Sequence, residues 1–306
     1  MTENSQAAFT AMLEKFKVEQ HKAFQALQPK LILIIMANTL DKELASGCEQ
    51  DVKRIRQIFK KICAYSHYTY LEIAITGNYY HTANLRAAIR KLEPMTIDVT
   101  IFYFSGHGFC YANDKSRKFP QLDMRHPIDS LAFNHISNIR KYSKNLHEVL
   151  QKIRLRGGRV NIVIGDCCST LIKNKRTSSS TLDLEVVEDV MAPVDKSVSK
   201  QEFYSEESMI DIIVSAAQIG QTAVADDKKG SLFTKNFTKA LENAFTDIPK
   251  GEKYLPWHKL LKKSAEMANK EAQQYDIGNN TPGQQMAIFK IYRENINFND
   301  LILKSK

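Results

Sequence analysis

Residues 97–108, IDVTIFYFSGHG, decide the fold of this chain together with a second stretch, VNIVIGDCC, at residues 160–168. Each begins with an apolar run typical of a buried strand and ends in a turn of small residues. The first turn presents the imidazole of His107, and the second presents the thiol of Cys168. If the two strands are neighbours in a parallel sheet, both side chains emerge at the same edge. That arrangement is the one a Cys/His nucleophilic site requires.

Apolar patterns in the rest of the chain predict the other elements. We expect strands at residues 31–36, 70–75, 97–104, 160–164, 210–215 and 285–291. We expect helices at residues 7–27, 51–64, 82–92, 144–154, 230–244 and 257–274. The alternation of strands and helices predicts an α/β fold with a central sheet of about six mostly parallel strands and helices on both faces.

Two long polar stretches interrupt this order. Residues 111–143 are rich in Lys, Arg, Asn and Asp, and they are too long for a simple connection, which makes them a candidate functional loop. Residues 173–208 are dense in Ser, Thr, Lys, Asp and Glu and contain no glycine. This second composition predicts a solvated linker or a disordered loop.

The composition is that of a globular protein with a substantial core, since 43% of its 306 residues are hydrophobic. The net charge is +9, but Lys and Arg are spread along the chain. We therefore expect no nucleic-acid partner, and a nucleic-acid binder is the minor alternative. Five cysteines without zinc-like spacing predict free thiols in a reducing compartment.

The sequence shows no pattern typical of a signal peptide or of a membrane-spanning helix. Residues 1–28 lack the apolar block of a signal peptide, and no apolar run approaches the roughly 20 residues of a membrane helix. We expect a cytoplasmic protein without a membrane partner. Export by a non-classical route is left open.

Four motifs, taken in their order along the chain, resemble those of the caspase-like cysteine peptidases, and among them the metacaspase branch. The SGHG and DCC turns each follow a predicted strand, and His107 and Cys168 are 168 − 107 = 61 residues apart. A separation of about 50 residues is typical of caspases. The segment GCEQDV at residues 47–52 resembles the Gly-Cys-x-x-Asp-Ala/Val turn of metacaspases. The segments SAAQ, QTA and GSLFT at residues 215–218, 221–223 and 230–234 resemble the small-subunit part of the family.

The resemblance implies a caspase-like fold, a three-layer sandwich around the central sheet. It divides the chain into an amphipathic N-terminal extension at residues 1–28, a peptidase domain at 29–292 and a tail at 293–306. Within the domain it implies a large-subunit part to about residue 172, a loop at 173–208 and a small-subunit part at 209–292. A monomer is the expected state.

The resemblance also assigns the catalytic roles. Cys168 is the expected nucleophile, His107 the general base and acid, and Cys167 a neighbour that points inward. The backbone N–H groups of Gly108 and Cys168 are the expected oxyanion hole. A third side chain that orients the histidine is not identified. The alternatives are a buried structural cysteine and an ordinary histidine at a strand end.

By the same resemblance, Asp51, Asp166 and Ser215 line the primary substrate pocket, which accepts Arg or Lys before the cut. A carboxylate pair suits a guanidinium because both groups bind in a bidentate manner. The alternative for Asp51 is an acid at the N-terminus of its own helix, where it complements the helix dipole. Asp226 or Asp227 adds negative charge to the pocket or is a solvated loop residue.

The predicted function is a cysteine endopeptidase that cuts proteins or peptides after Arg or Lys. Self-processing is expected in the loop at residues 173–208, which contains Lys173, Lys175, Arg176, Lys196 and Lys200. The alternative is an inactive caspase-like scaffold, because Ser169-Thr170-Leu171 follow Cys168 where metacaspases usually have His-Ser-Gly. No metal site is assigned, and a calcium requirement is left open because no ligands are placed.

Overall fold

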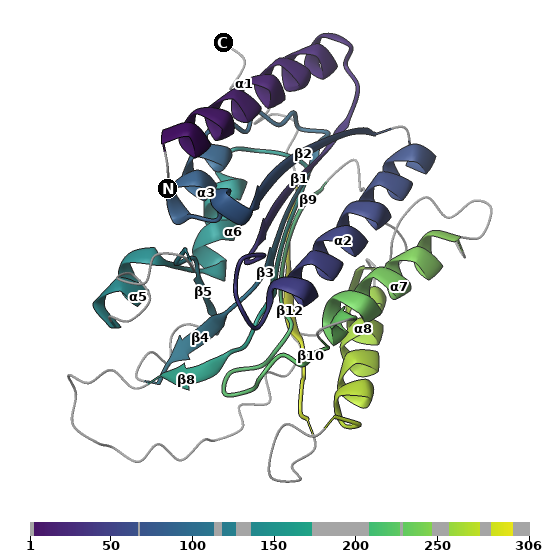
Figure 1. Cartoon of the computed structure of the whole chain (residues 1–306). Helices are drawn as coiled ribbons and strands as arrows, with labels where there is room; N and C mark the ends of the chain where they lie inside the picture. Colours follow the sequence, from purple (N-terminus) through teal and green to yellow (C-terminus); the bar gives the residue numbers. More distant parts are fainter. Residues whose placement is uncertain are drawn as a thin grey trace.

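A six-stranded sheet forms the centre of the molecule, with the strand order β12-β9-β7-β3-β1-β2 (Figure 1). The computed structural model describes residues 3–66, 68–112, 118–126, 136–172, 208–226, 229–246, 257–275 and 283–295. The strands of the sheet are β1 (Lys30–Ala37), β2 (Thr69–Thr76), β3 (Val99–Ser105), β7 (Val160–Asp166), β9 (Ser208–Ser215) and β12 (Ile288–Asn295). All neighbours are parallel except β12, which runs antiparallel to β9. The predicted sheet of about six mostly parallel strands is confirmed.

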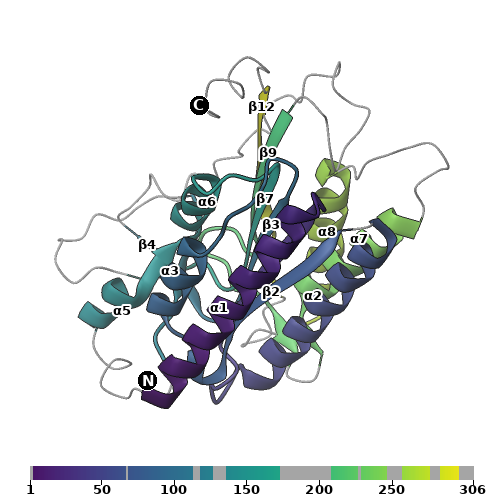
Figure 2. The same cartoon turned by 90° about the horizontal axis from the view of Figure 1, so that it is seen from above.

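Helices cover both faces of this sheet and complete the predicted three-layer sandwich (Figure 2). One face carries α1 (Glu3–Gln25), α3 (Thr82–Arg90) and α6 (Leu146–Arg154). The other face carries α2 (Ala45–Ser66), α7 (Leu232–Thr246) and α8 (Trp257–Ala272). In the described part of the chain no helix is long and apolar enough to span a membrane.

The alternation of side chains along β1 explains why both faces are covered. All eight residues of β1 are buried, as a continuous apolar run in a parallel strand predicts. Leu33 and Ile35 pack in the cluster under α2, α7 and α8, whereas Ile34 and Met36 pack in the cluster under α1, α3 and α6. Successive side chains point to opposite faces, so one strand contributes to two apolar cores.

Helix α2 begins earlier than its apolar pattern predicts. It starts at Ala45 and not at Asp51, because the Asp41 side chain and carbonyl accept the backbone N–H groups that open it. Asp51 therefore lies in the second turn of α2. The alternative interpretation of Asp51 as the N-terminal acid of its own helix is wrong.

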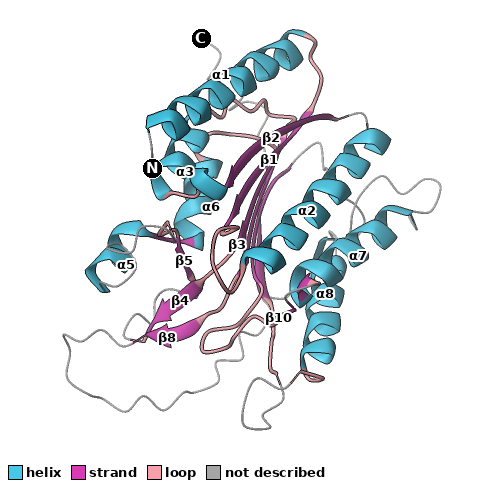
Figure 3. Ribbon diagram, viewed as in Figure 1, coloured by secondary structure: helices cyan, strands magenta, loops and turns pink. Residues whose placement is uncertain are grey.

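A small second sheet lies beyond the carboxyl ends of the central strands (Figure 3). Its order is β6-β5-β4-β8, formed by β4 (Gly108–Tyr111), β5 (Gln121–Asp123), β6 (Ser143–Asn145) and β8 (Thr170–Ile172). The prediction of a loop across residues 111–143 is therefore wrong for the described residues, which also include α5 (Ile136–Tyr142). Two adjacent strands of this sheet, β4 and β8, start directly after the turns that carry His107 and Cys168.

The described residues also form short elements between the longer ones. These elements are η1 (Gly77–Tyr79), β10 (Ala225–Asp226) and β11 (Gly230–Ser231). β12 runs to Asn295, beyond the residue at which the predicted domain ends. The expected loop lies outside the described residues from 173 to 207, as does most of the expected tail, from 296 to 306.

Candidate active site

His107 and Cys168 lie at the same edge of the central sheet. β3 and β7 are adjacent parallel strands, and their register pairs Ser105 with Asp166, the last residue of each strand. His107 and Cys168 each follow two residues after that pair. The contact continues one residue further, since the Gly106 N–H donates to the Asp166 carbonyl at 3.4 Å. The register therefore brings the two turns together, as the order of the elements predicts.

Gly108 is the point of closest approach between the two turns. A Cβ atom at this position would lie 2.5 Å from the Cys168 carbonyl oxygen and closer still to the Cys167 sulfur. Glycine is required here because no other residue leaves room for the opposite backbone. Cys167 points inward and is buried in the apolar cluster under α3 and α6, as predicted. The backbones of Gly108 and Cys168, the expected oxyanion-hole donors, are neighbours.

The imidazole of His107 contacts Asp41, a residue that sequence patterns do not connect with it. Nε2 lies 3.1 Å from Asp41 Oδ2; the His107 side chain is 38% exposed and the Asp41 side chain 8%. The other oxygen of Asp41 accepts the N–H groups of Glu43 and Leu44, at 2.9 and 3.1 Å. An acid just before a helix is a recognisable capping signal. That signal does not reveal which histidine the same carboxylate contacts.

The thiol of Cys168 is partly buried beside the loop that follows β9. Its sulfur lies 4.0 Å from the Ala223 carbonyl oxygen. Burial, with a smaller contribution from the nearby Asp166 carboxylate, raises the pKa of Cys168 above its usual value. A thiol in this environment is protonated at neutral pH, so a nucleophilic role requires a base close by.

Ser169 anchors the turn after Cys168 to the loop after β9. Its side chain is buried, and its hydroxyl donates to the Ala217 carbonyl at 2.9 Å. Its N–H donates to the Gln221 carbonyl at 2.9 Å, and its own carbonyl accepts the Gly220 N–H at 2.8 Å. The Ser-Thr-Leu sequence therefore builds a fixed turn that leads directly into β8.

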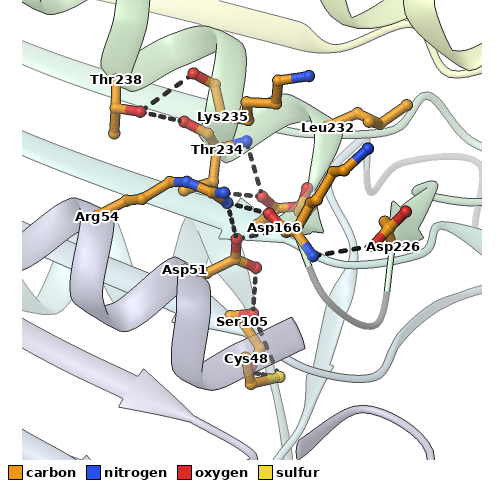
Figure 4. Close-up of polar contacts among 12 residues, drawn as sticks. Cys48, Asp51, Arg54, Ser105, Asp166, Asp226, Leu232, Thr234, Lys235 and Thr238 are labelled. Atoms are coloured by element: carbon orange, nitrogen blue, oxygen red, sulfur yellow. Dashed lines mark hydrogen bonds and ion pairs between the residues drawn. The ribbon is translucent and has the colours of Figure 1, made fainter. Parts of the chain in front are cut away.

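Asp51 and Asp166 meet at the amino-terminal end of α7 (Figure 4). Asp51 Oδ1 accepts the Ser231 N–H at 2.9 Å, and Oδ2 accepts the Ser105 hydroxyl at 3.2 Å. Asp166 Oδ2 accepts the N–H and the hydroxyl of Thr234, at 3.2 and 2.5 Å. Both carboxylates are buried. The structure therefore brings the two predicted pocket aspartates together, across α2, β7 and α7.

The two carboxylates titrate above the usual range. Burial first, and then repulsion from Asp166, raises the pKa of Asp51 well above its usual value. Burial likewise raises the pKa of Asp166, although the hydrogen bonds that its carboxylate accepts lower this pKa in part. Two close carboxylates in a buried site do not ionise independently, and a cation placed beside them would lower both raised pKa values.

Arg54 brings a cation to the same cluster from one helical turn after Asp51 (Figure 4). Its Nη1 lies 3.7 Å from Asp51 Oδ1 and donates to the Lys229 carbonyl. Gly230 lies against both side chains, since an added Cβ atom would lie 3.0 Å from Arg54 Nη1 and closer to Asp51. The space beside Asp51 is therefore filled by Arg54 and by residues 229–231.

Ser215 and Asp226, the other predicted pocket residues in the described chain, make different contacts. The Ser215 hydroxyl donates to the Ala217 carbonyl at 2.8 Å and lies 3.5 Å from the Ser169 hydroxyl. None of its described hydrogen bonds reaches Asp51. The Asp226 carboxylate accepts the Lys229 N–H at 2.9 Å.

Cys48 belongs to the Asp51 cluster, although the sequence motif that contains it gives it no role. Its sulfur lies 3.3 Å from the Ser105 hydroxyl oxygen, and burial raises the pKa of Cys48 to about 12. Within the described residues no group of three or more His, Cys, Asp or Glu side chains is arranged to hold a metal ion.

Comparison with known families agrees with the observed fold. The sequence profile of the family described as the caspase domain matches residues 29–282, which is most of the chain and includes every site residue described above. A search of curated proteins finds no significant match.

Proposed function

Because this chain belongs to the caspase-domain family of peptidases, we propose that it is a metacaspase-type cysteine endopeptidase that cuts after Arg or Lys. The β3–β7 register carries the proposal, since it sets His107 and Cys168 two residues beyond one paired position at the sheet edge. Membership of the family implies protein substrates. The catalytic roles and the preference for a basic residue are the proposed part.

The reaction begins when His107 takes the proton of the Cys168 thiol. The thiolate attacks the peptide carbonyl carbon, an S–C bond forms, and the carbonyl oxygen becomes an oxyanion. The N–H groups of Gly108 and Cys168 stabilise that oxyanion. The C–N bond then breaks, and His107 gives its proton to the departing amine. A water molecule, deprotonated by His107, hydrolyses the thioester and regenerates the thiol.

The Asp51–Asp166 pair supports a preference for Arg or Lys before the cut. Two buried carboxylates with raised pKa values gain a partner when a guanidinium or ammonium group enters, because its charge favours their ionised forms. Arg54 already places a guanidinium 3.7 Å from Asp51, and this contact supports the proposed preference for a basic side chain. Residues 229–231 and Arg54 must move aside before a substrate side chain takes that place.

The second candidate function is an inactive caspase-like scaffold. The observation that favours it is the closed state of the pocket, in which Asp51 and Asp166 are 2% and 4% exposed and bonded to α7 and its flanking residues. Ser169 adds to this argument, because its turn differs from the usual family sequence. Intact His107 and Cys168 favour the active enzyme.

Two fluorogenic peptides, one ending in Arg and one in Asp, separate these candidates. The purified protein should cleave the Arg peptide, with or without added calcium, and Cys168→Ala should lose at least about 10⁴-fold in kcat. Cys167→Ala is the matched control and should retain activity. The active-enzyme proposal is wrong if neither peptide is cleaved, and the pocket assignment is wrong if only the Asp peptide is.

Self-processing is the remaining part of the proposal. The basic residues between positions 173 and 208 are expected cleavage sites, in a part of the chain that lies almost wholly outside the described residues. Stored wild-type protein should separate into two fragments on a denaturing gel, while Cys168→Ala stays intact. Equal fragmentation of both proteins would point to a contaminating protease.

A further inference from the structure

We propose that Asp41 is the positioning residue of the site: it holds the His107 ring by Nε2 and leaves Nδ1 as the atom that takes the Cys168 proton. The inference rests on the proposed peptidase function. Asp41 is then the third member of the site beside His107 and Cys168, a position that the two sequence motifs leave unassigned.

The Asp41 carboxylate is held rigidly before it meets the histidine. Its Oδ1 accepts the N–H groups of Glu43 and Leu44, and its backbone carbonyl accepts the Ala45 N–H at 3.1 Å. These bonds fix the side chain at the first turn of α2. Only Oδ2 is left to face His107, and it lies 3.1 Å from Nε2. The carboxylate is buried while the ring is partly exposed, so the more rigid group orients the more mobile one.

The chemistry of the pair then selects the tautomer of His107. An ionised carboxylate only accepts hydrogen bonds, so the ring nitrogen that faces it must carry a proton. With Nε2 protonated, the neutral ring keeps its lone pair on Nδ1. That nitrogen is therefore the base for the thiol. After it takes the proton, the ring is a cation next to Asp41, which stabilises it.

The substitution that tests this role is Asp41→Asn, because it keeps the helix cap and changes only the tautomer of His107. The amide oxygen still accepts the Glu43 and Leu44 N–H groups, but its NH₂ group now faces Nε2. The ring must then accept at Nε2 and carry its proton on Nδ1, where it no longer removes the thiol proton. We expect kcat to fall by about 10²–10⁴-fold, the usual contribution of a general base, with KM within about threefold of wild type.

Two measurements distinguish this role from a structural one. The thermal midpoint of Asp41→Asn should stay near that of wild type, whereas that of Asp41→Ala should fall, because alanine also removes the helix cap. Glu43→Gln is the matched control, since it removes one exposed negative charge from the same helix end. It should leave kcat unchanged.

The ¹⁵N NMR signals of the His107 ring report the tautomer without any turnover. Wild-type protein should show a protonated Nε2, and Asp41→Asn a protonated Nδ1. A wild-type kcat in Asp41→Asn, or the same tautomer in both proteins, overturns the proposal. If wild-type protein cleaves no peptide, the proposed function fails, and the NMR comparison still decides whether Asp41 sets the ring.

Discussion

At the scale of single residues, the buried Asp51–Asp166 pair links the proposed substrate pocket to stability. The folded state raises the pKa of both carboxyl groups, so it binds more protons than the unfolded chain at the same pH. Stability therefore falls as pH rises from the unfolded pKa, about 4, through the raised folded value. The protein keeps two acids at a position where neutral side chains would be more stable, which is typical of a functional site.

Asp51→Asn tests directly whether the buried Asp51 carboxyl group lowers the stability of the protein at high pH. The amide still accepts the Ser231 N–H but carries no charge, so the variant should unfold at a higher temperature than wild type at pH 8. The difference should shrink as the pH falls through about 4, since below that pH wild-type Asp51 is protonated in both the folded and the unfolded state. Thermal midpoints measured across this pH range give the comparison. Glu49→Gln, an exposed acid on the same helix, should show no such trend.

The residues of the site differ in how well the sequence predicts their positions. His107, Cys168 and Asp166 follow apolar strands directly, so motif and strand order predict their edge of the sheet. Asp41 is different, because its contact depends on how the turn between β1 and α2 folds back over the sheet edge. Arg54 is likewise unexpected, since its position follows from the packing of residues 229–231 against α2.

At the scale of elements, two glutamines tie the loop after β9 to the chain before β12. Gln285 Oε1 accepts the Val224 N–H at 2.9 Å, and Gln221 Oε1 accepts the Met286 N–H at 2.8 Å. The loop between Ala216 and Val224 contacts both Cys168 and Ser169. These two glutamine hydrogen bonds therefore position the backbone that borders the Cys168 thiol.

Gln285→Ala should loosen that loop. It leaves the buried Val224 N–H without a partner, which costs about 1–3 kcal/mol of unfolding free energy. Hydrogen exchange should accelerate in residues 216–224 while β1 and β3 keep their protection. Gln284→Ala, an exposed neighbour, is the control. Unchanged exchange in the loop would contradict the positioning role of Gln285.

The elements also differ in how well the sequence predicts them. All six central strands are predicted. β1, β3 and β7 are buried along their whole length and are mainly apolar runs that stand out in the sequence, whereas β2 alternates between buried and half-buried residues. The second sheet is not predicted, since its strands have only three or four residues and contain polar side chains such as Gln121, Lys144 and Asn145. Segments this short cannot show a hydrophobic periodicity.

At the scale of the whole molecule, a buried ion pair ties the sheet together at the edge opposite the site. Lys30 Nζ lies 2.7 Å from Asp98 Oδ2, and both side chains are fully buried. Asp98 also accepts the Lys30 and Met95 N–H groups, and its carbonyl accepts the Arg159 N–H at 2.8 Å. One residue therefore joins the beginnings of β1, β3 and β7.

Lys30→Met should destabilise the protein without altering the chemistry. It leaves the Asp98 carboxylate buried without its cation, a change that costs about 3–5 kcal/mol. Urea unfolding should show the loss, while kcat of the folded enzyme at 25 °C should match wild type. Lys42→Met removes an exposed lysine and should change neither quantity. A large fall in kcat for Lys30→Met would mean that the two sheet edges are coupled.

The order of strands in the sheet has a consequence for how the protein is made. β9 lies beside β7, yet it is translated only after residues 173–207. On the ribosome, β7 therefore exists for a time with no neighbour on that side. Its residues are buried on both faces in the finished protein, and an unpaired apolar strand edge invites association with other chains. The nascent chain thus has a period of vulnerability, during which chaperones would most strongly affect the yield of soluble protein.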